Sequence, residues 1–159
     1  MYTRGRKDRN TPRCRGGGSS QSDRRFAGIC EDIVAGRDIS WDKNDGTQFL
    51  SARQIAQVYL KLVESDLNEE VFFALGQNFV SWYEIALMAK EMMPESESRI
   101  TSPTQEKPHA LYDVSKIQRT FGLAFDSRED LKEHIRWNLD MAKKKAAGEQ
   151  VPDTNHENG

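Results

Sequence analysis

Two short motifs of the same kind fix where two helices of this chain begin. Ser51 is followed three residues later by Gln54, and Ser81 is followed three residues later by Glu84. In such a capping box the serine hydroxyl accepts from the N3 amide, and the Gln or Glu side chain accepts from the serine amide. Each serine also stands between the two apolar residues of a hydrophobic staple. The helix that begins after Ser51 is predicted to bury one apolar face, formed by Ile55, Val58, Tyr59, Leu62 and Val63.

Three further helices follow from the spacing of apolar residues and from the residues that end them. The segment 26–34 carries apolar side chains at helical spacing, and Gly36 is expected to end it. Asp113 is expected to cap a short helix that Gly122 closes. Ser127 is expected to cap a long helix with acidic residues in its first turn and three lysines in its last turn, the signs that the helix dipole favours.

Strands are predicted only as short segments between these helices. The segments 38–41, 47–50 and 99–101 combine β-branched or aromatic residues with polar flanks. The segment 71–75 is densest in such residues and is predicted to be a buried strand. The fold class is therefore predicted to be α/β, an α+β-like fragment in which short strands alternate with capped helices. It has too few strands for a complete nucleotide-binding sheet.

Large apolar residues are concentrated in the middle of the 159-residue chain. Residues 1–23 are rich in Arg, Gly and Ser, and residues 146–159 are polar. Because such compositions bury too little apolar surface to offset the entropy cost of ordering, both ends are expected to be disordered. Residues 24–145 are expected to form one domain with one core.

The charge and cysteine content limit the classes of partner and compartment. A net charge of −2 argues against nucleic acid and membrane partners, although a basic arm in residues 1–23 can hold phosphates non-specifically. No apolar run approaches the roughly 20 residues of a membrane span. Cys14 and Cys30 do not make a disulfide framework, which favours a reduced, cytoplasmic protein. No cysteine or histidine spacing predicts a metal site.

Several residues invite a catalytic role but are better explained structurally. Tyr112 and Lys116 have the Tyr-x-x-x-Lys spacing, in which an ammonium can assist proton transfer by a phenol. Asp113 as a helix cap would leave Tyr112 just outside the helix, so no catalytic residue is predicted. The three histidines are expected at the surface: His109, His134 and His156. The three tryptophans are expected to pack structurally: Trp41, Trp82 and Trp137.

Arginines are the stronger candidates for ligand binding, because a guanidinium grips phosphate or carboxylate through two parallel hydrogen bonds. Arg24 and Arg25 precede the first apolar stripe, and Arg53 stands in the first turn of the helix that Ser51 caps, where the helix end itself attracts anions. The glycine cluster at residues 16–18 lacks the spacing of a dinucleotide-binding turn, and no apolar strand precedes it. No dinucleotide site is therefore predicted within this chain.

Four stretches occur in the order and spacing of a known family. Residues 26–39 end in Gly-Arg-Asp-Ile, and residues 45–56 run from Asp-Gly-Thr-Gln-Phe to Arg-Gln-Ile-Ala. Residues 71–86 contain Leu-Gly followed by Val-Ser-Trp-Tyr-Glu-Ile-Ala, and residues 113–122 run from Asp-Val-Ser-Lys to Phe-Gly. Together they span about three-quarters of the chain. The chain resembles the C-terminal part of the NAD-dependent epimerase/dehydratase family, the extended short-chain dehydrogenase/reductases.

The resemblance implies a substrate-binding lobe of an NAD(P)-dependent oxidoreductase or isomerase, inactive alone. A separate Rossmann lobe would hold NAD or NADP and supply the catalytic Tyr-x-x-x-Lys, and the cofactor is not expected to bind this chain alone. The substrate would be a sugar-like or other small carbonyl compound. Five residues are predicted to bind the substrate: the three arginines Arg24, Arg25 and Arg53, and Gln48 and Phe49 of the second matching stretch.

Two departures from the family pattern bear on the substrate. Thr47 stands near where nucleotide-sugar members carry an arginine for the diphosphate, and Gln54 replaces the family's aspartate. Both argue against a nucleotide-sugar substrate. The alternative function is a non-catalytic interaction module, which forms a homo- or hetero-oligomer through the surface that a Rossmann lobe would otherwise cover.

Overall fold

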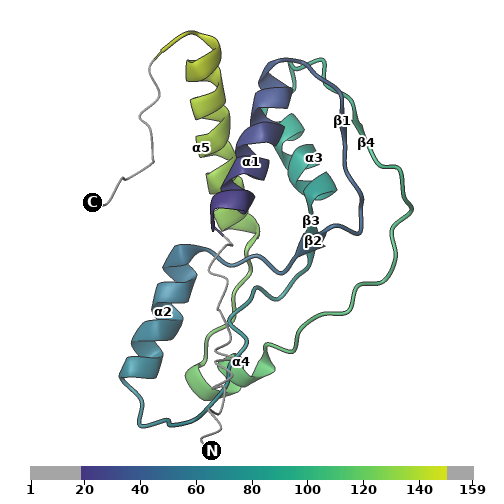
Figure 1. Ribbon diagram of the computed structural model, residues 1–159. Helices are drawn as coiled ribbons and strands as arrows, with labels where there is room; N and C mark the ends of the chain where they lie inside the picture. The colour runs from purple at the N-terminus through teal and green to yellow at the C-terminus, as the bar shows by residue number, and fades with distance from the viewer. Residues whose placement is uncertain (1–18, 150–159) are drawn as a thin grey trace, which may run out of the picture.

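The computed structural model describes residues 19–149 as a mixture of helices and very short strands (Figure 1). The elements in chain order are α1 (Ser19–Val34), β1 (Ile39–Ser40), β2 (Gly46–Thr47), α2 (Ala52–Val63), β3 (Val80–Ser81), α3 (Trp82–Met92), β4 (Ile100–Thr101), α4 (Ser115–Phe121) and α5 (Arg128–Ala146). α1, α3 and α5 pack on one another, while α2 and α4 lie apart from them (Figure 1). The predicted mixture of helices and short strands is confirmed.

The ends of the predicted domain differ slightly from the observed helices. α1 begins before the predicted boundary at residue 24, and α5 ends just after the predicted boundary at residue 145. The predictions for residues 1–18 and 150–159 lie outside the described residues, and so do those for Cys14 and His156. No helix between residues 19 and 149 is long and apolar enough to cross a membrane.

The strands form two separate two-stranded sheets. β1 and β4 are parallel, with Ile39 opposite Ile100, and β2 and β3 are antiparallel, with Gly46 opposite Ser81. The predicted strands at 38–41 and 99–101 therefore exist in shortened form. The predicted strand at 47–50 is mostly wrong, because the chain leaves the β2–β3 ladder immediately after Thr47.

The prediction of a buried strand at residues 71–75 is wrong. The segment has no strand assignment, and Val71 and Phe73 are 75% and 51% exposed. No strand within the described residues runs alongside it, so its backbone has no ladder to join. Phe72 and Ala74 pack against a small apolar cluster instead. Residues 71–74 alternate between exposed and half-buried side chains, as in a half-buried strand, but no described strand pairs with them.

Both predicted capping boxes are confirmed. The Ser51 hydroxyl accepts from the Gln54 amide at 3.2 Å, and the Gln54 side chain accepts from the Ser51 amide at 3.1 Å. At α3 the corresponding distances are 3.1 Å from the Glu84 amide to Ser81 Oγ and 2.8 Å from the Ser81 amide to Glu84 Oε2. These local bonds fix the direction in which each helix leaves its preceding segment.

The predicted helix C-termini are confirmed by their glycines. Gly36 has φ 69°, and the amide of Arg37 donates to the carbonyl of Asp32 while that of Gly36 donates to Ile33. These two bonds form the Schellman motif. Gly122 has φ 68° after α4 and donates to the carbonyl of Gln118. A side chain at either glycine would force an L-residue into the left-handed region.

The predicted N-terminal caps of α4 and α5 are only partly right. α4 begins after Val114, and Asp113 accepts from the Ser115 amide at 2.8 Å without being the cap residue. Hydrogen bonding from Ser115 lowers the pKa of Asp113 below its usual value. Ser127 does precede α5, but its hydroxyl makes no cap bond and donates instead to the carbonyl of Phe49. A tertiary contact has therefore replaced the local one at Ser127.

The main core lies between α1, α3 and α5. Its most completely buried large side chains are aliphatic residues of these helices and of β3, namely Ile29, Ile33, Val80, Ile85 and Ile135. A second, smaller cluster forms around Val58 of α2, Ile117 of α4 and Phe125. The foldable part of the chain therefore has one main core and one satellite cluster under α2 and α4.

The predicted inner face of α2 is partly wrong. Val58 is buried and Ile55 and Leu62 are half-buried, as expected, but Tyr59 and Val63 are 65% and 84% exposed. α2 stands away from the three-helix layer and contacts the satellite cluster along one narrow side (Figure 1). The apolar stripe of α2 is therefore wider than the surface against which it packs among the described residues.

Burial of the Cys30 thiol makes the main core less stable at alkaline pH. Its thiol is 1% exposed, and burial, with a smaller contribution from the negative charge of Glu31, raises the pKa of Cys30 to about 12. In the unfolded chain a cysteine has a pKa of about 8.5. The folded state therefore keeps a proton that the unfolded state loses, so this contribution is complete below about pH 8.5 and disappears as pH rises toward 12.

We expect the free energy of unfolding to fall by up to about 1.4 kcal/mol per pH unit above about pH 9 because of Cys30. Urea denaturation at pH 8, 9 and 10 measures this slope. The Cys30→Ala variant keeps every other titrating group and should show a shallower slope, although it is less stable at each pH. Equal slopes in the two proteins would contradict the prediction.

Candidate functional site

A groove of about 750 Å³ is lined by residues of α1, of the start of α2 and the segment before it, and of the first half of α5. Its lining combines aromatic and aliphatic side chains with a few polar and charged groups: Phe26, Phe49, Leu50, Ser51, Ala52, Arg53, Ile55, Ser127, Asp130, Leu131, Glu133, His134 and Trp137. Small-molecule sites are usually concave, mostly apolar and roughly 300–1,000 Å³ in volume. The groove has the size and composition of such a site.

Aromatic rings from three parts of the chain build one wall of the groove. The ring of Phe26 meets that of Phe49 edge to face at 5.9 Å between centroids and that of His134 at 4.6 Å. His134 in turn stacks on Trp137 at 6.2 Å. Trp137 is 49% exposed, so one flat ring remains available to a ligand. Such rings supply large apolar contact area at a low entropy cost.

The charged part of the groove is an ion-pair cluster between α2 and α5. Arg53 Nη2 donates to Asp130 Oδ1 at 3.0 Å and to Glu133 Oε2 at 3.3 Å. Arg53 and Glu133 are well exposed, whereas the Asp130 side chain is only 20% exposed. The second carboxylate oxygen of Asp130, Oδ2, is buried and receives no hydrogen bond from the described residues.

The floor of the groove is held by close backbone contacts around Phe49. The Ser127 hydroxyl, at the start of α5, donates to the carbonyl of Phe49. Gly76 lies against the same carbonyl, and a Cβ at Gly76 would overlap both the Phe49 carbonyl oxygen and the Ser127 hydroxyl oxygen. Glycine is therefore required at position 76 for three chain segments to meet beneath the groove.

No protein-family model, curated protein or solved structure matches this chain. The assignment of a site therefore depends on its residues and their geometry.

Two of the five predicted substrate-binding residues, Phe49 and Arg53, line the groove. Gln48 does not line it, because its side chain is buried and bonded to backbone. Its amide nitrogen donates to the carbonyls of Gly76 at 2.9 Å and Tyr112 at 3.2 Å, and its oxygen accepts from the Tyr112 amide at 2.7 Å. The structure thus gives Gln48 a role in joining three segments of the chain.

The two predicted arginines of α1 lie outside the groove lining. The guanidinium of Arg25 lies 5.2 Å from the ring centroid of Trp82 and 5.9 Å from that of Trp41, with an ion pair to Asp45 at 3.8 Å. Arg24 is exposed on the same helix. The residue of this turn that lines the groove is the neighbouring Phe26.

Tyr112 lies just outside α4, as the sequence predicts, and Lys116 is held by partners on a neighbouring segment. Tyr112 is 60% exposed and precedes α4, while Lys116 lies within that helix. The Lys116 ammonium pairs with Glu70 at 2.5 Å, donates to the Val71 carbonyl at 2.9 Å and lies 4.6 Å from the ring centroid of Phe72. The charge of Lys116 therefore holds the loop at residues 69–72 against α4.

The remaining sequence candidates also have structural partners. His109 stacks on Phe79 with 3.7 Å between ring centroids, and Trp41 packs against the buried Trp82 at 6.1 Å. Within residues 19–149, no group of three or more histidine, cysteine or acidic side chains is arranged to hold a metal ion. Structural packing is confirmed for Trp82, and Trp137 faces the groove.

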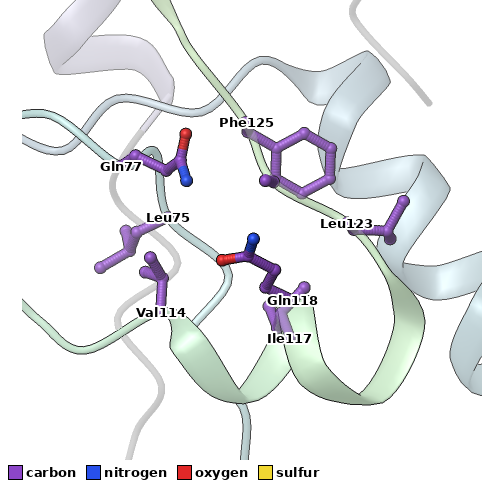
Figure 2. A pocket seen from close by; sticks show the side chains of 8 residues that line it. Leu75, Gln77, Val114, Ile117, Gln118, Leu123 and Phe125 are labelled. Atoms are coloured by element: carbon purple, nitrogen blue, oxygen red, sulfur yellow. The ribbon is translucent and has the colours of Figure 1, made fainter.

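A second cavity lies beside α4 and is too small for a ligand. Figure 2 shows the side chains that surround it, from the segment before β3, from α4 and from the segment after α4. Its volume is about 10 Å³, which is at most enough for one water molecule. The groove between α1, α2 and α5 is therefore the better candidate site.

Sequence reasoning missed the part of the groove that α5 contributes. Asp130 is predicted only as an acidic residue in the first turn of its helix, no role is predicted for Glu133, and His134 and Trp137 are predicted only as surface or packing residues. One signal was present: Asp130, Glu133, His134 and Trp137 recur at three- and four-residue spacing, which places them along one side of α5. That side is the one that faces Arg53.

Proposed function

We propose that this chain is the substrate-binding lobe of an NAD(P)-dependent epimerase- or dehydratase-type enzyme, with the cofactor held by a separate Rossmann lobe. The observation that carries the proposal is the groove of about 750 Å³ whose lining includes Phe49 and Arg53, two residues that the sequence predicts to bind the substrate. The lobe would supply substrate recognition, and the nicotinamide would supply hydride transfer.

The arrangement of strands supports the proposal that this chain binds the substrate while another lobe binds the cofactor. Every strand within residues 19–149 is two residues long, and the two sheets are separate. A dinucleotide is held by a glycine-rich turn between a buried strand of a larger parallel sheet and a helix. The described residues contain no such unit, so we assign the cofactor to another lobe.

A second candidate function, an interaction module, is favoured by exposed apolar side chains around α2. Tyr59, Leu60 and Val63 of α2 are 65%, 63% and 84% exposed. Exposed large apolar groups gathered on one element are typical of surfaces that another protein covers. A Rossmann lobe and a non-catalytic partner would both use this surface, so ligand binding in the groove distinguishes the two functions.

The proposal is tested by titrating the full chain with NADH and NADPH and by screening small hydroxy and carbonyl compounds by NMR. We expect no enhancement of nicotinamide fluorescence at micromolar protein. We also expect chemical-shift changes at Phe49, Arg53 and the Trp137 indole with at least some of the small compounds. Because small fragments bind weakly, millimolar dissociation constants are expected.

Tight NADH binding by the isolated chain would contradict the absence of the cofactor site. Compounds that shift no groove residue would contradict the substrate-binding lobe. In that case, self-association in sedimentation velocity would favour the interaction module, because that function needs the α2 surface and not the groove.

A further inference from the structure

The carboxylate of Asp130 is only partly compensated by the protein. Oδ1 accepts one hydrogen bond from Arg53, an exposed side chain, while Oδ2 is buried and receives none from the part of the chain that the structure describes. A carboxylate that is mostly removed from water is unfavourable unless donors or positive charge replace its hydration. Asp130 and Glu133 therefore place two carboxylates beside the groove with one guanidinium between them.

The charge of the groove does not favour an anionic ligand. Its lining contains two carboxylates, Asp130 and Glu133, against one arginine. Arg53 is already bonded to Asp130 and Glu133, at 3.0 Å and 3.3 Å. A phosphate or carboxylate bound to the remaining donors of Arg53 would lie beside these two negative charges.

The rest of the lining favours a flat apolar body. Phe26 and Phe49 contribute aromatic surface, Leu50, Ile55 and Leu131 contribute aliphatic surface, and Trp137 presents a half-exposed ring. A ring placed against Trp137 would bury apolar area without disturbing the ion-pair cluster. An ammonium near the same ring would gain a favourable cation–π interaction.

We propose that the groove binds a neutral or cationic ring-bearing molecule whose hydroxyl or ammonium group donates to the Asp130–Glu133 carboxylate pair, and that it discriminates against phosphate- and carboxylate-bearing ligands. The inference rests on the proposed function and narrows the substrate class of that same groove. It places substrate selection on α5, with Asp130 as a ligand-binding residue and Arg53 as a positioning residue for both carboxylates.

The test compares four probes that share a benzyl or phenyl ring and differ in one polar group. Benzylamine carries a cationic donor, benzyl alcohol a neutral donor, benzyl methyl ether no donor, and benzoate an anion. Binding to the full chain is followed by NMR through the Trp137 indole signal, which a Trp137→Phe variant identifies. We expect benzylamine to bind about tenfold more tightly than benzyl methyl ether, with benzyl alcohol between them and benzoate weakest.

Two isosteric variants of α5 separate a local contact from general charge. Asp130→Asn removes a charge from the groove, and Asp140→Asn removes the same charge from an exposed position of the same helix that does not line the groove. We expect Asp130→Asn to abolish most of the tenfold preference for benzylamine and to strengthen benzoate binding, because Arg53 loses a partner. Asp140→Asn should leave both affinities within about twofold of the parent chain.

Each outcome has a defined meaning for the two proposals. Tighter binding of benzoate than of benzylamine by the parent chain, or equal effects of the two variants, would overturn the inference but leave the substrate-binding groove standing. Failure of all four probes to shift any groove signal would overturn both. If Asp130→Asn fails to fold, as circular dichroism would reveal, the order of the four probes on the parent chain still decides the inference.

Discussion

Ile135→Ala should lower the free energy of unfolding by about 4 kcal/mol, the largest effect expected of any single substitution considered for this chain. Ile135 of α5 is 0% exposed and belongs to the core between α1, α3 and α5. Its backbone carbonyl also accepts from the Cys30 thiol at 3.8 Å. The substitution removes buried methyl and methylene groups, which loses their transfer free energy. It also leaves a cavity between packed helices, which adds a further cost.

Urea denaturation followed by circular dichroism measures this change, and Val63→Ala is the matched control. Val63 is 84% exposed on α2, so we expect its truncation to change stability by less than about 0.5 kcal/mol. Because a small domain is stable by only about 5–15 kcal/mol, Ile135→Ala should unfold at a clearly lower urea concentration. Equal midpoints for the two variants would show that α5 does not complete the core.

Gln48→Ala should lower the free energy of unfolding by about 3 kcal/mol, because one side chain satisfies three backbone groups. Gln48 is 4% exposed and bonds to the carbonyl of Gly76 and to both backbone groups of Tyr112. Without it, these buried or half-buried polar groups lose their partners, and the segments before α2, β3 and α4 are no longer joined. Gln48→Glu should also destabilise the fold, since a carboxylate cannot donate to the two carbonyls.

The control is Gln77→Ala, which removes an exposed amide from the adjacent segment. We expect a change of less than about 0.5 kcal/mol in the same urea experiment. The comparison also decides between the two roles considered for Gln48. A residue that only contacts substrate would change ligand affinity and leave stability unaltered, whereas a structural residue would change stability without any ligand.

Local sequence signals were sufficient for the features that local bonds determine. The capping boxes at Ser51 and Ser81 and the glycine at the end of α4 are each formed by residues close in sequence, and each is found where predicted. The buried strand at 71–75 failed because a strand also needs a neighbouring strand, which composition does not reveal. Ser127 failed as a cap because the distant carbonyl of Phe49 takes its hydroxyl proton.

The sequence predicted the part of the candidate site that precedes and begins α2, but not the part that α5 contributes. Phe49 and Arg53 follow from a motif within one stretch of sequence. Asp130 and Trp137 belong to the site because α5 returns to the N-terminal ends of α1 and α2, and that return is a consequence of tertiary packing. Periodicity showed that these side chains share one side of α5. It did not show what that side faces.

The pairing of the first described helix with the last has a consequence for synthesis in the cell. The bond between Cys30 and Ile135 spans 105 residues, and α1 finds its main packing partner in α5. At about 5–20 residues per second, a ribosome needs roughly 5–20 s to add that length of chain. During this interval α3 covers only part of the apolar face of α1, so nascent chains depend on protection from premature association until α5 emerges.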